Sequence, residues 1–294
     1  MVEIAQQVIN GLSLGSIYAL IALGYTMVYG IIQLINFAHG DVYMVGAYVG
    51  YFCMAHLGLG FFEALVAAML VCMVLGVLIE RIAYKPLRNS TRIAVLITAI
   101  GMSLLIEYTM MFFVGPQVRS YPALPEFMNK SYVFGPVVIS GKQLLIILMS
   151  ILLMALLQFI VKNTKMGKAM RAVSQDPDAA RLMGIDIDRT ISFTFALGSA
   201  LAGAAGVLVG VYYNSINPLM GILPGLKAFI AAVFGGIGII PGAMIGAYFI
   251  GATETVVSAL GFSTYRDAVV FALLIAILII KPTGLLGKNV KEKV

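Results

Sequence analysis

The chain has 294 residues, of which 61% are hydrophobic and 11% are charged, and its formal net charge is +6. A mean hydropathy of +1.01 lies far outside the range of soluble domains, so the composition excludes a water-soluble globular protein. The basic residues gather between long apolar runs, as membrane topology requires, so the positive charge does not indicate nucleic-acid binding.

Long apolar runs recur along the whole sequence and predict an all-α, polytopic membrane protein, because a helix satisfies its backbone hydrogen bonds within one segment. We expect a single transmembrane domain, 1–294, with helices near 7–31, 41–57, 62–81, 93–114, 143–161, 191–213, 226–238, 240–259 and 264–281. Segment 226–238 is too short to cross upright and ends among glycines. It is predicted to be broken or re-entrant, which gives eight or nine crossings in total.

Three basic groups set the expected orientation. They are Arg81 to Arg92, the six Lys and Arg residues between 162 and 190, and Lys281 to Lys293. The positive-inside rule assigns all three groups to the cytoplasm. The proline-rich segment 115–142 and the N-terminus are then expected outside, and the C-terminus in the cytoplasm. We interpret 115–142 as a rigid, irregular outer loop that joins two helices or receives an external partner.

The loop 162–190 is long and strongly charged for such a hydrophobic chain. Asp176 can cap a helix, Pro177 fits the first helical position, and Gly184 can end a helix in the left-handed conformation. These signals predict a short helix near 177–183 on the cytoplasmic side. A short helix presented there indicates a segment that another protein grips.

Polar residues within apolar segments are the candidates for a translocation pathway, because ionisable groups at membrane depth are costly and usually face a cavity or a partner. The polar break 36–41 is either a plain turn, with Asp41 as the N-cap of the next helix, or a broken segment near the pathway. Glu107 and Glu254 suit structural hydrogen bonding and pathway lining equally well. The candidates are Asn36, His39, Asp41, Glu107, Gly235, Gly236, Gly238 and Glu254.

Enzyme motifs carry little weight. Ser13 lies in a G-x-S-x-G match, but the match falls within an apolar helix and favours close helix packing. An intramembrane serine hydrolase would also need a histidine that reaches Ser13. Cys53 and Cys72 are expected to be small buried hydrophobic residues rather than ligands.

The sequence contains no G-x-x-x-x-G-K-[ST] phosphate loop, so any ATP hydrolysis must take place on another polypeptide. No cofactor is expected on this chain. An ion-coupled secondary transporter that uses Glu107 or Glu254 is an alternative. It does not explain the charged loop 162–190.

Three motifs in order resemble one family. They are INFAHGDVYMVGAY at 35–48, MGKAMRAVSQDPDAARLMGI at 166–185 and KAFIAAVFGGIGIIPGAMIGAYFIGATE at 227–254. Over nearly its whole length the chain is similar to the permease subunits of ABC importers for branched-chain amino acids, of the LivH type. The resemblance implies a subunit of the bacterial inner (cytoplasmic) membrane that translocates leucine, isoleucine and valine by alternating access. Relatives that carry another small amino acid, an amide or urea would look similar.

The resemblance also implies partners within the lipid bilayer and beside it. They are a sister permease of the LivM type, two ATP-binding subunits of the LivG and LivF types, and a periplasmic or lipid-anchored substrate-binding protein. The resemblance assigns ATPase coupling to Gly167, Arg171, Ala172, Asp176, Asp178, Ala179, Gly184 and Ile185. Two positions depart from the family pattern: Ile239 replaces a serine, and Glu107 replaces a frequent amide.

Overall fold

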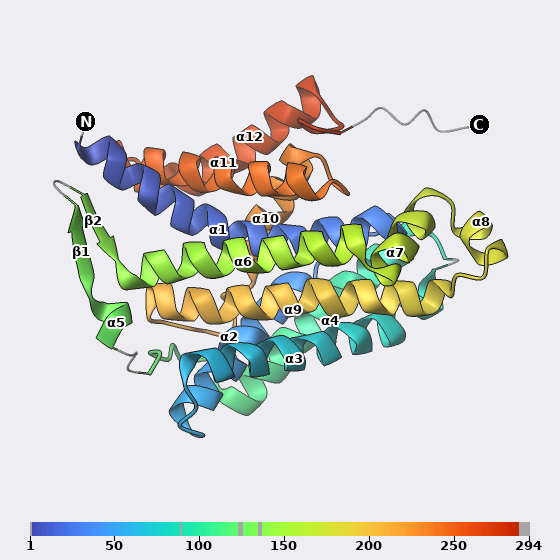
Figure 1. The fold of residues 1–294 in the computed structure, drawn as a ribbon, viewed down its shortest axis with the longest axis horizontal. Helices are drawn as coiled ribbons and strands as arrows, with labels where there is room; N and C mark the ends of the chain where they lie inside the picture. The colour runs from blue at the N-terminus through green and yellow to red at the C-terminus, as the bar shows by residue number, and fades with distance from the viewer. Residues whose placement is uncertain (1, 89, 123–125, 135–136, 288–294) are drawn as a thin grey trace.

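The computed structural model describes residues 2–88, 90–122, 126–134 and 137–287. Long helices run side by side along the long axis of the molecule (Figure 1). In chain order the helices are α1 (Val2–Ile32), α2 (His39–Ala55), α3 (Phe61–Ile79), α4 (Arg92–Val114), α5 (Glu126–Asn129), α6 (Gly141–Asn163), α7 (Lys165–Gln175), α8 (Pro177–Leu182), α9 (Ile187–Tyr213), α10 (Ile222–Gly235), α11 (Ile240–Ala259) and α12 (Arg266–Ile280).

Seven segments among the described residues are long and apolar enough to cross a membrane. They are 4–32, 61–87, 93–114, 141–163, 187–213, 240–259 and 263–280. Two shorter helices, α2 and α10, lie among them. The prediction of a polytopic helical membrane protein is therefore confirmed. The segment expected at 226–238 is helical from Ile222 to Gly235. The helix thus starts four residues earlier than expected and ends at the glycine bend.

Helices α1 and α9 form the centre of the bundle, with 78% and 94% of their most apolar windows buried. Small residues allow the close packing: Gly251 of α11 lies against Gly15 of α1, and Gly46 of α2 lies against Gly203 of α9. Helices α4 and α12 lie at the periphery, where only 17% and 6% of the corresponding windows are buried.

The two ends of the bundle differ (Figure 1). The α8 end, as we name it, carries α7, α8, the start of α9 and the end of α12. The hairpin end carries the start of α1, helix α5 and two antiparallel strands, β1 (Ser131–Phe134) and β2 (Val137–Ser140). The irregular loop predicted over 115–142 is thus partly wrong, because its second half pairs as a hairpin with Ser131 opposite Ser140.

Tyr121 fixes the first half of the 115–142 segment to the bundle. Its ring lies against Gly210 of α9, and its hydroxyl donates a hydrogen bond to the Ala47 carbonyl at 2.8 Å. Burial raises the pKa of the Tyr121 phenol, so the side chain stays neutral and acts as a donor. The first half of the 115–142 segment is therefore attached to the hairpin end of the bundle.

Candidate functional site

Helix α8 forms where the local sequence signals predict it. The Asp176 carboxylate accepts a hydrogen bond from the Ala179 N–H at 2.9 Å, and Pro177 is the first helical residue. Gly184 has a φ of 81° and closes the helix, so that the Ile185 N–H donates to the Ala180 carbonyl at 3.0 Å. The predicted helix near 177–183 is confirmed.

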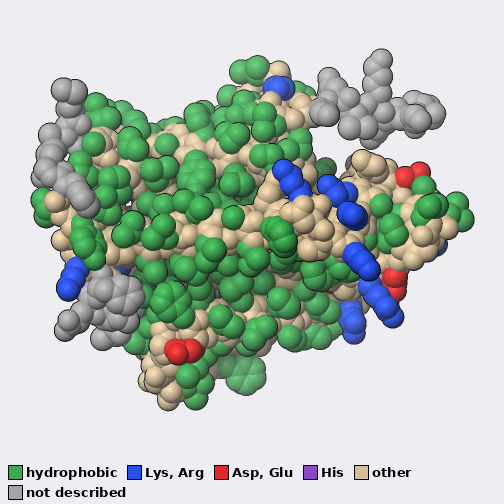
Figure 2. Space-filling view, viewed as in Figure 1, with side chains coloured by type: hydrophobic (Ala, Val, Ile, Leu, Met, Phe, Trp, Pro, Cys, Tyr) green, Lys and Arg blue, Asp and Glu red, His purple; other side chains and the backbone are tan. Residues whose placement is uncertain are grey.

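Helix α8 exposes an apolar tip at a charged end of the molecule. Leu182 and Met183 are 89% and 83% exposed, while Ala180 is buried beneath them. Figure 2 shows Lys and Arg side chains gathered toward this end, around α7. Large apolar side chains that project into a charged, water-facing region are typical of a contact surface for another protein.

The remaining candidates for ATPase coupling fall into two groups, one at α8 and one at α7. Asp178, Ala179 and Gly184 are exposed with the tip of α8, and Ile185 is half-buried behind it. Gly167 is buried in the first turn of α7, where a Cβ would meet the carbonyl oxygens of Ile160 and Val161 at the end of α6. Arg171 is exposed on α7, and Ala172 is half-buried beside it.

Helix α7 was not predicted, because its lysines suggested a loop. Thr164 caps α7 by accepting a hydrogen bond from the Gly167 N–H at 3.0 Å. One face of α7 buries Gly167, Met170 and Val173. This amphipathic helix therefore attaches the exposed α8 to the bundle.

A small crevice of about 70 Å³ joins α7 to the interior of the bundle. Arg171 and Ser174 line it from one side, and Gly30 of α1 and Gly238 line it from the other. Gly236 and Gly238 have φ values of 109° and 87°, which residues with a side chain rarely adopt. The glycine bend between α10 and α11 is therefore a packing element that lies beside α7.

Residues 281–287 close the glycine bend from outside. The Leu285 N–H donates to the Phe234 carbonyl at 2.8 Å, and the Leu286 N–H donates to the Gly235 carbonyl at 3.0 Å. Gly235 also lies directly against Gly242. The predicted pathway residues Gly235 and Gly236 thus serve backbone packing in this structure.

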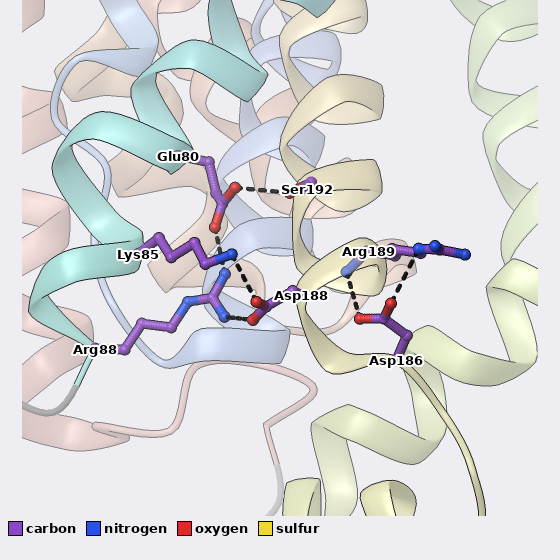
Figure 3. A network of polar contacts seen from close by, with 7 residues as sticks. All are labelled: Glu80, Lys85, Arg88, Asp186, Asp188, Arg189 and Ser192. Atoms are coloured by element: carbon purple, nitrogen blue, oxygen red, sulfur yellow. Dashed lines mark hydrogen bonds and ion pairs between the residues drawn. The ribbon is translucent and has the colours of Figure 1, made fainter.

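An ionic cluster joins the start of α9 to the segment after α3 (Figure 3). In this Glu80 cluster, Arg88 pairs with the buried Glu80 and with Asp188, the latter at 2.5 Å. Lys85 lies 2.7 Å from Asp188, and the Ser192 hydroxyl donates to Glu80 at 2.7 Å. Sequence reasoning missed this cluster, because Asp188 and Ser192 of α9 lie a hundred residues or more along the chain from their partners Lys85, Arg88 and Glu80.

Asp41 of α2 and Glu107 of α4 line the same pocket. Their positions in the sequence did not indicate this proximity. Both line a pocket of about 320 Å³ with Tyr25 and apolar residues of α4 and α10. The Ser103 hydroxyl donates to Asp41 at 2.5 Å. Asp41 lies in the first turn of α2 and is not its N-cap, because the helix already starts at His39.

Asn36 and His39 stabilise the entry to α2. The Tyr84 hydroxyl donates to the Asn36 side-chain oxygen at 3.1 Å and thereby joins the linker to the π-helical turn Glu80–Tyr84. The His39 ring lies against Gly24 of α1 and edge-on to Tyr25, with centroids 4.8 Å apart. Both side chains are buried in helix packing.

Glu254 pairs with a lysine that sequence reasoning overlooked. The Lys227 ammonium lies 3.0 Å from Glu254 and 2.6 Å from Asp267, which gives the Lys227 cluster. The Tyr18 hydroxyl donates to Glu254 at 3.3 Å. Lys227 is the one basic residue between 190 and 265 of the sequence, and that isolation was the available signal.

Comparison with known proteins adds the family. Residues 7–278 match the model of the branched-chain amino acid transport system permease component. The chain belongs to this permease family. The high-affinity branched-chain amino acid permease proteins LivH of Escherichia coli and BraD of Pseudomonas aeruginosa are 46% and 44% identical to it, over 98% of this chain and 97% of theirs.

A more distant relative agrees with this permease assignment, and one solved structure has a similar fold. The probable branched-chain amino acid permease LivH of Methanocaldococcus jannaschii is 30% identical, over 94% of this chain and 90% of its own. The structure of PsaBC from Streptococcus pneumoniae in complex with Fab has a TM-score of 0.50 and 13% identity, over 93% of this chain and 91% of that chain. The latter likeness concerns the fold alone.

The permease is a transport component and not an enzyme. Ser13 is buried in α1, where its hydroxyl donates to the Ile9 carbonyl at 2.9 Å, as a packed helix serine does. Cys53 and Cys72 are buried and free, as predicted.

Proposed function

We propose that the permease is the translocation subunit of an ATP-driven importer of leucine, isoleucine and valine, and that separate ATPase subunits move it through α8. The observation that carries this proposal is the capped helix α8, with its exposed Leu182 and Met183 at the charged end of the bundle. A partner groove would bury these two side chains, and Arg171 and Arg181 would add charge-assisted contacts around them.

The proposal assigns an orientation to the molecule. The α8 end faces the cytoplasm of a bacterial cell, together with the C-terminus, and the N-terminus and the hairpin end face outward. The gathering of Lys and Arg side chains at the α8 end supports this orientation. Lys288, Lys291 and Lys293 of the third basic group lie outside the described residues.

The partners follow from the family. One LivG-type and one LivF-type ATPase would bind the α8 end, and a substrate-binding protein, periplasmic or lipid-anchored, would dock on the hairpin end. A LivM-type sister permease would complete the pathway within the bilayer. The barely covered helices α4 and α12, with Phe112, Phe113 and Ile279 largely exposed, support a lateral partner.

Force applied to α8 has two routes into the bundle. The first runs through the start of α9 and the Glu80 cluster to the segment after α3. The second runs through α7 and the crevice at Gly238 to α1 and α11. ATP binding would favour one arrangement of these elements over another, and the pathway would open alternately to the two sides.

Asp41 and Glu107 would line this pathway, because their pocket lies beside the weakly covered helix α4. The pocket walls are otherwise mostly apolar, which suits a substrate that must bind weakly and leave. The pairing of Glu254 with Lys227 makes Glu254 less suited to couple transport to a free cation, as a secondary transporter would require.

The test is a double substitution, Arg171→Glu with Ala179→Trp, because both residues are exposed and neither supports the core. The variant should insert normally, but pull-down of the ATPase subunits and ATP-dependent leucine uptake should each fall at least tenfold. Lys130→Glu, an exposed charge reversal at the hairpin end, is the control and should retain ATPase pull-down. Unchanged uptake by the double variant would refute the coupling assignment. Uptake of urea but not of leucine by the wild-type transporter would refute the substrate assignment.

A further inference from the structure

The Lys227 cluster lines a cavity of about 290 Å³ between α1, α9, α10, α11 and α12. The cavity has two kinds of wall. Lys227, Glu254 and Asp267 supply charge on one side, and aliphatic side chains such as Leu14, Ile17 and Leu223 line the other. Pockets for drug-sized ligands measure roughly 300–1,000 Å³, so this cavity suits a small molecule with a polar and an aliphatic part.

Burial increases from the mouth of the cavity to its floor. The side chains of Arg266 and Asp267 are 49% and 35% exposed, whereas those of Lys227 and Glu254 are 5% and 3% exposed. Both the mouth and the floor therefore carry one cation and one carboxylate. A ligand that enters past α12 meets charges of both signs along its way.

The internal pairing leaves capacity for a ligand. The Glu254 and Asp267 oxygens that face Lys227 lie at ion-pair distance, but neither makes an aligned hydrogen bond within the described part of the chain. Tyr18 satisfies the other Glu254 oxygen. Buried ion pairs add little net stability, since desolvation offsets their attraction, so a role beyond folding is expected of charges held at this depth.

We propose that this cavity is a transient binding site for a free aliphatic amino acid in its zwitterionic form. Lys227, assisted by Arg266, binds the ligand carboxylate, and Glu254 and Asp267 accept hydrogen bonds from its ammonium group. The aliphatic side chain packs against Leu14, Ile17 and Leu223. This assignment rests on the proposed function, because amino-acid import brings the ligand to the cavity.

The chemistry accounts for both selectivity and release. A zwitterion exchanges the internal ion pairs for equivalent ones, so the exchange is nearly balanced and the ligand is held weakly. An amine without a carboxylate, or an acid without an ammonium group, leaves one buried charge of the cluster without its partner, which is costly. Urea and simple amides offer neither charge.

The test separates a binding site from a structural ion pair. Lys227→Met with Glu254→Gln removes both buried charges at similar volume, and the Gln can still accept from Tyr18. A structural pair replaced in this way costs little stability, so a purely structural role predicts normal uptake. Our proposal predicts that the complete transporter, reconstituted with its ATPases and binding protein, still assembles but loses leucine uptake at least tenfold.

Leucine binding to the detergent-solubilised transporter without its binding protein gives a second readout, measured by saturation-transfer NMR. Wild type should bind leucine at least tenfold more tightly than isoamylamine or 4-methylpentanoate, each of which lacks one charge. The double variant should lose this preference. Equal binding of the three compounds by wild type, or an unchanged preference in the variant, overturns the site.

Leu223→Trp covers the case in which the charge variant fails to fold. This residue is 49% exposed and lines the cavity, so tryptophan fills the space and leaves the charges in place. Its leucine uptake should fall at least tenfold, and wild-type uptake by this variant overturns the site. If the wild-type transporter itself takes up no leucine, the proposed function fails. If wild type transports leucine and both variants match it, only the cavity assignment fails.

Discussion

Two ionic clusters of the permease bury a glutamate beside a cation, yet they differ in what surrounds them. Glu80 is fully buried and is satisfied on both oxygens, by Arg88 and by Ser192, while Lys85 and Asp188 extend the cluster to the surface. Glu254 instead borders a cavity together with Lys227, and its oxygen that faces Lys227 makes no aligned hydrogen bond within the described residues. The comparison teaches that burial of charge alone does not indicate a site, and that unfilled space beside the charge does.

The largest effect should come from removing one member of the Glu80 cluster. Arg88→Met leaves Glu80 buried without its cation, and we expect a loss of about 3 kcal/mol, at the lower end for broken buried pairs because Arg88 is 19% exposed. Thermal unfolding of the purified permease should show a clearly lowered midpoint. Arg189→Gln, which breaks an exposed pair with Asp186, is the matched control and should shift the midpoint little.

A paired substitution sharpens the contrast between the clusters. Glu80→Gln added to Arg88→Met removes the uncompensated charge. The double variant should regain most of the stability and of the uptake, as expected if the ion pair has a purely structural role. The corresponding double variant, Lys227→Met with Glu254→Gln, should be nearly as stable as wild type but should lose leucine uptake. If the double variant at Glu80 and Arg88 folded well but remained inactive, the distinction between a structural ion pair and a binding site would be wrong.

A smaller effect is expected at the cap of α8. Asp176→Ala removes the hydrogen bond to the Ala179 N–H and should destabilise this short helix by about 1 kcal/mol. Hydrogen exchange of the amides in 178–183 should become faster, and ATP-dependent uptake should fall a fewfold. Asp176→Asn keeps a good capping residue, so it should behave like wild type. Equal effects of the two substitutions would indicate that the charge matters and the cap does not.

Local signals in the sequence predicted local structure well. The apolar runs predicted the long helices, and Asp176, Pro177 and Gly184 predicted α8, because a cap, a first turn and a left-handed end depend on neighbouring residues. The hairpin and α7 were missed, because proline and lysine content suggested loops there. Formation of the hairpin and of α7 depends on packing against distant parts of the chain.

The candidate sites depended on contacts that a single sequence does not contain. Asp41 and Ser103 lie 62 residues apart in the chain, and their contact follows from how α2 and α4 pack. Lys227 stood alone in an apolar segment, but its partners Glu254 and Asp267 come from two later helices. The sequence supplied the ionisable residues, and only the fold paired them.

We propose above all that ATPase subunits bind α8 from the cytoplasm. Cys53 and Cys72 are the two cysteines of the sequence and both are buried, so Leu182→Cys introduces an exposed thiol at the tip of α8. A membrane-impermeant maleimide should label this thiol in inside-out vesicles and not in right-side-out vesicles, and co-expressed ATPase subunits should reduce the labelling severalfold. Labelling from the outer side, or labelling that the ATPase subunits leave unchanged, would contradict the account.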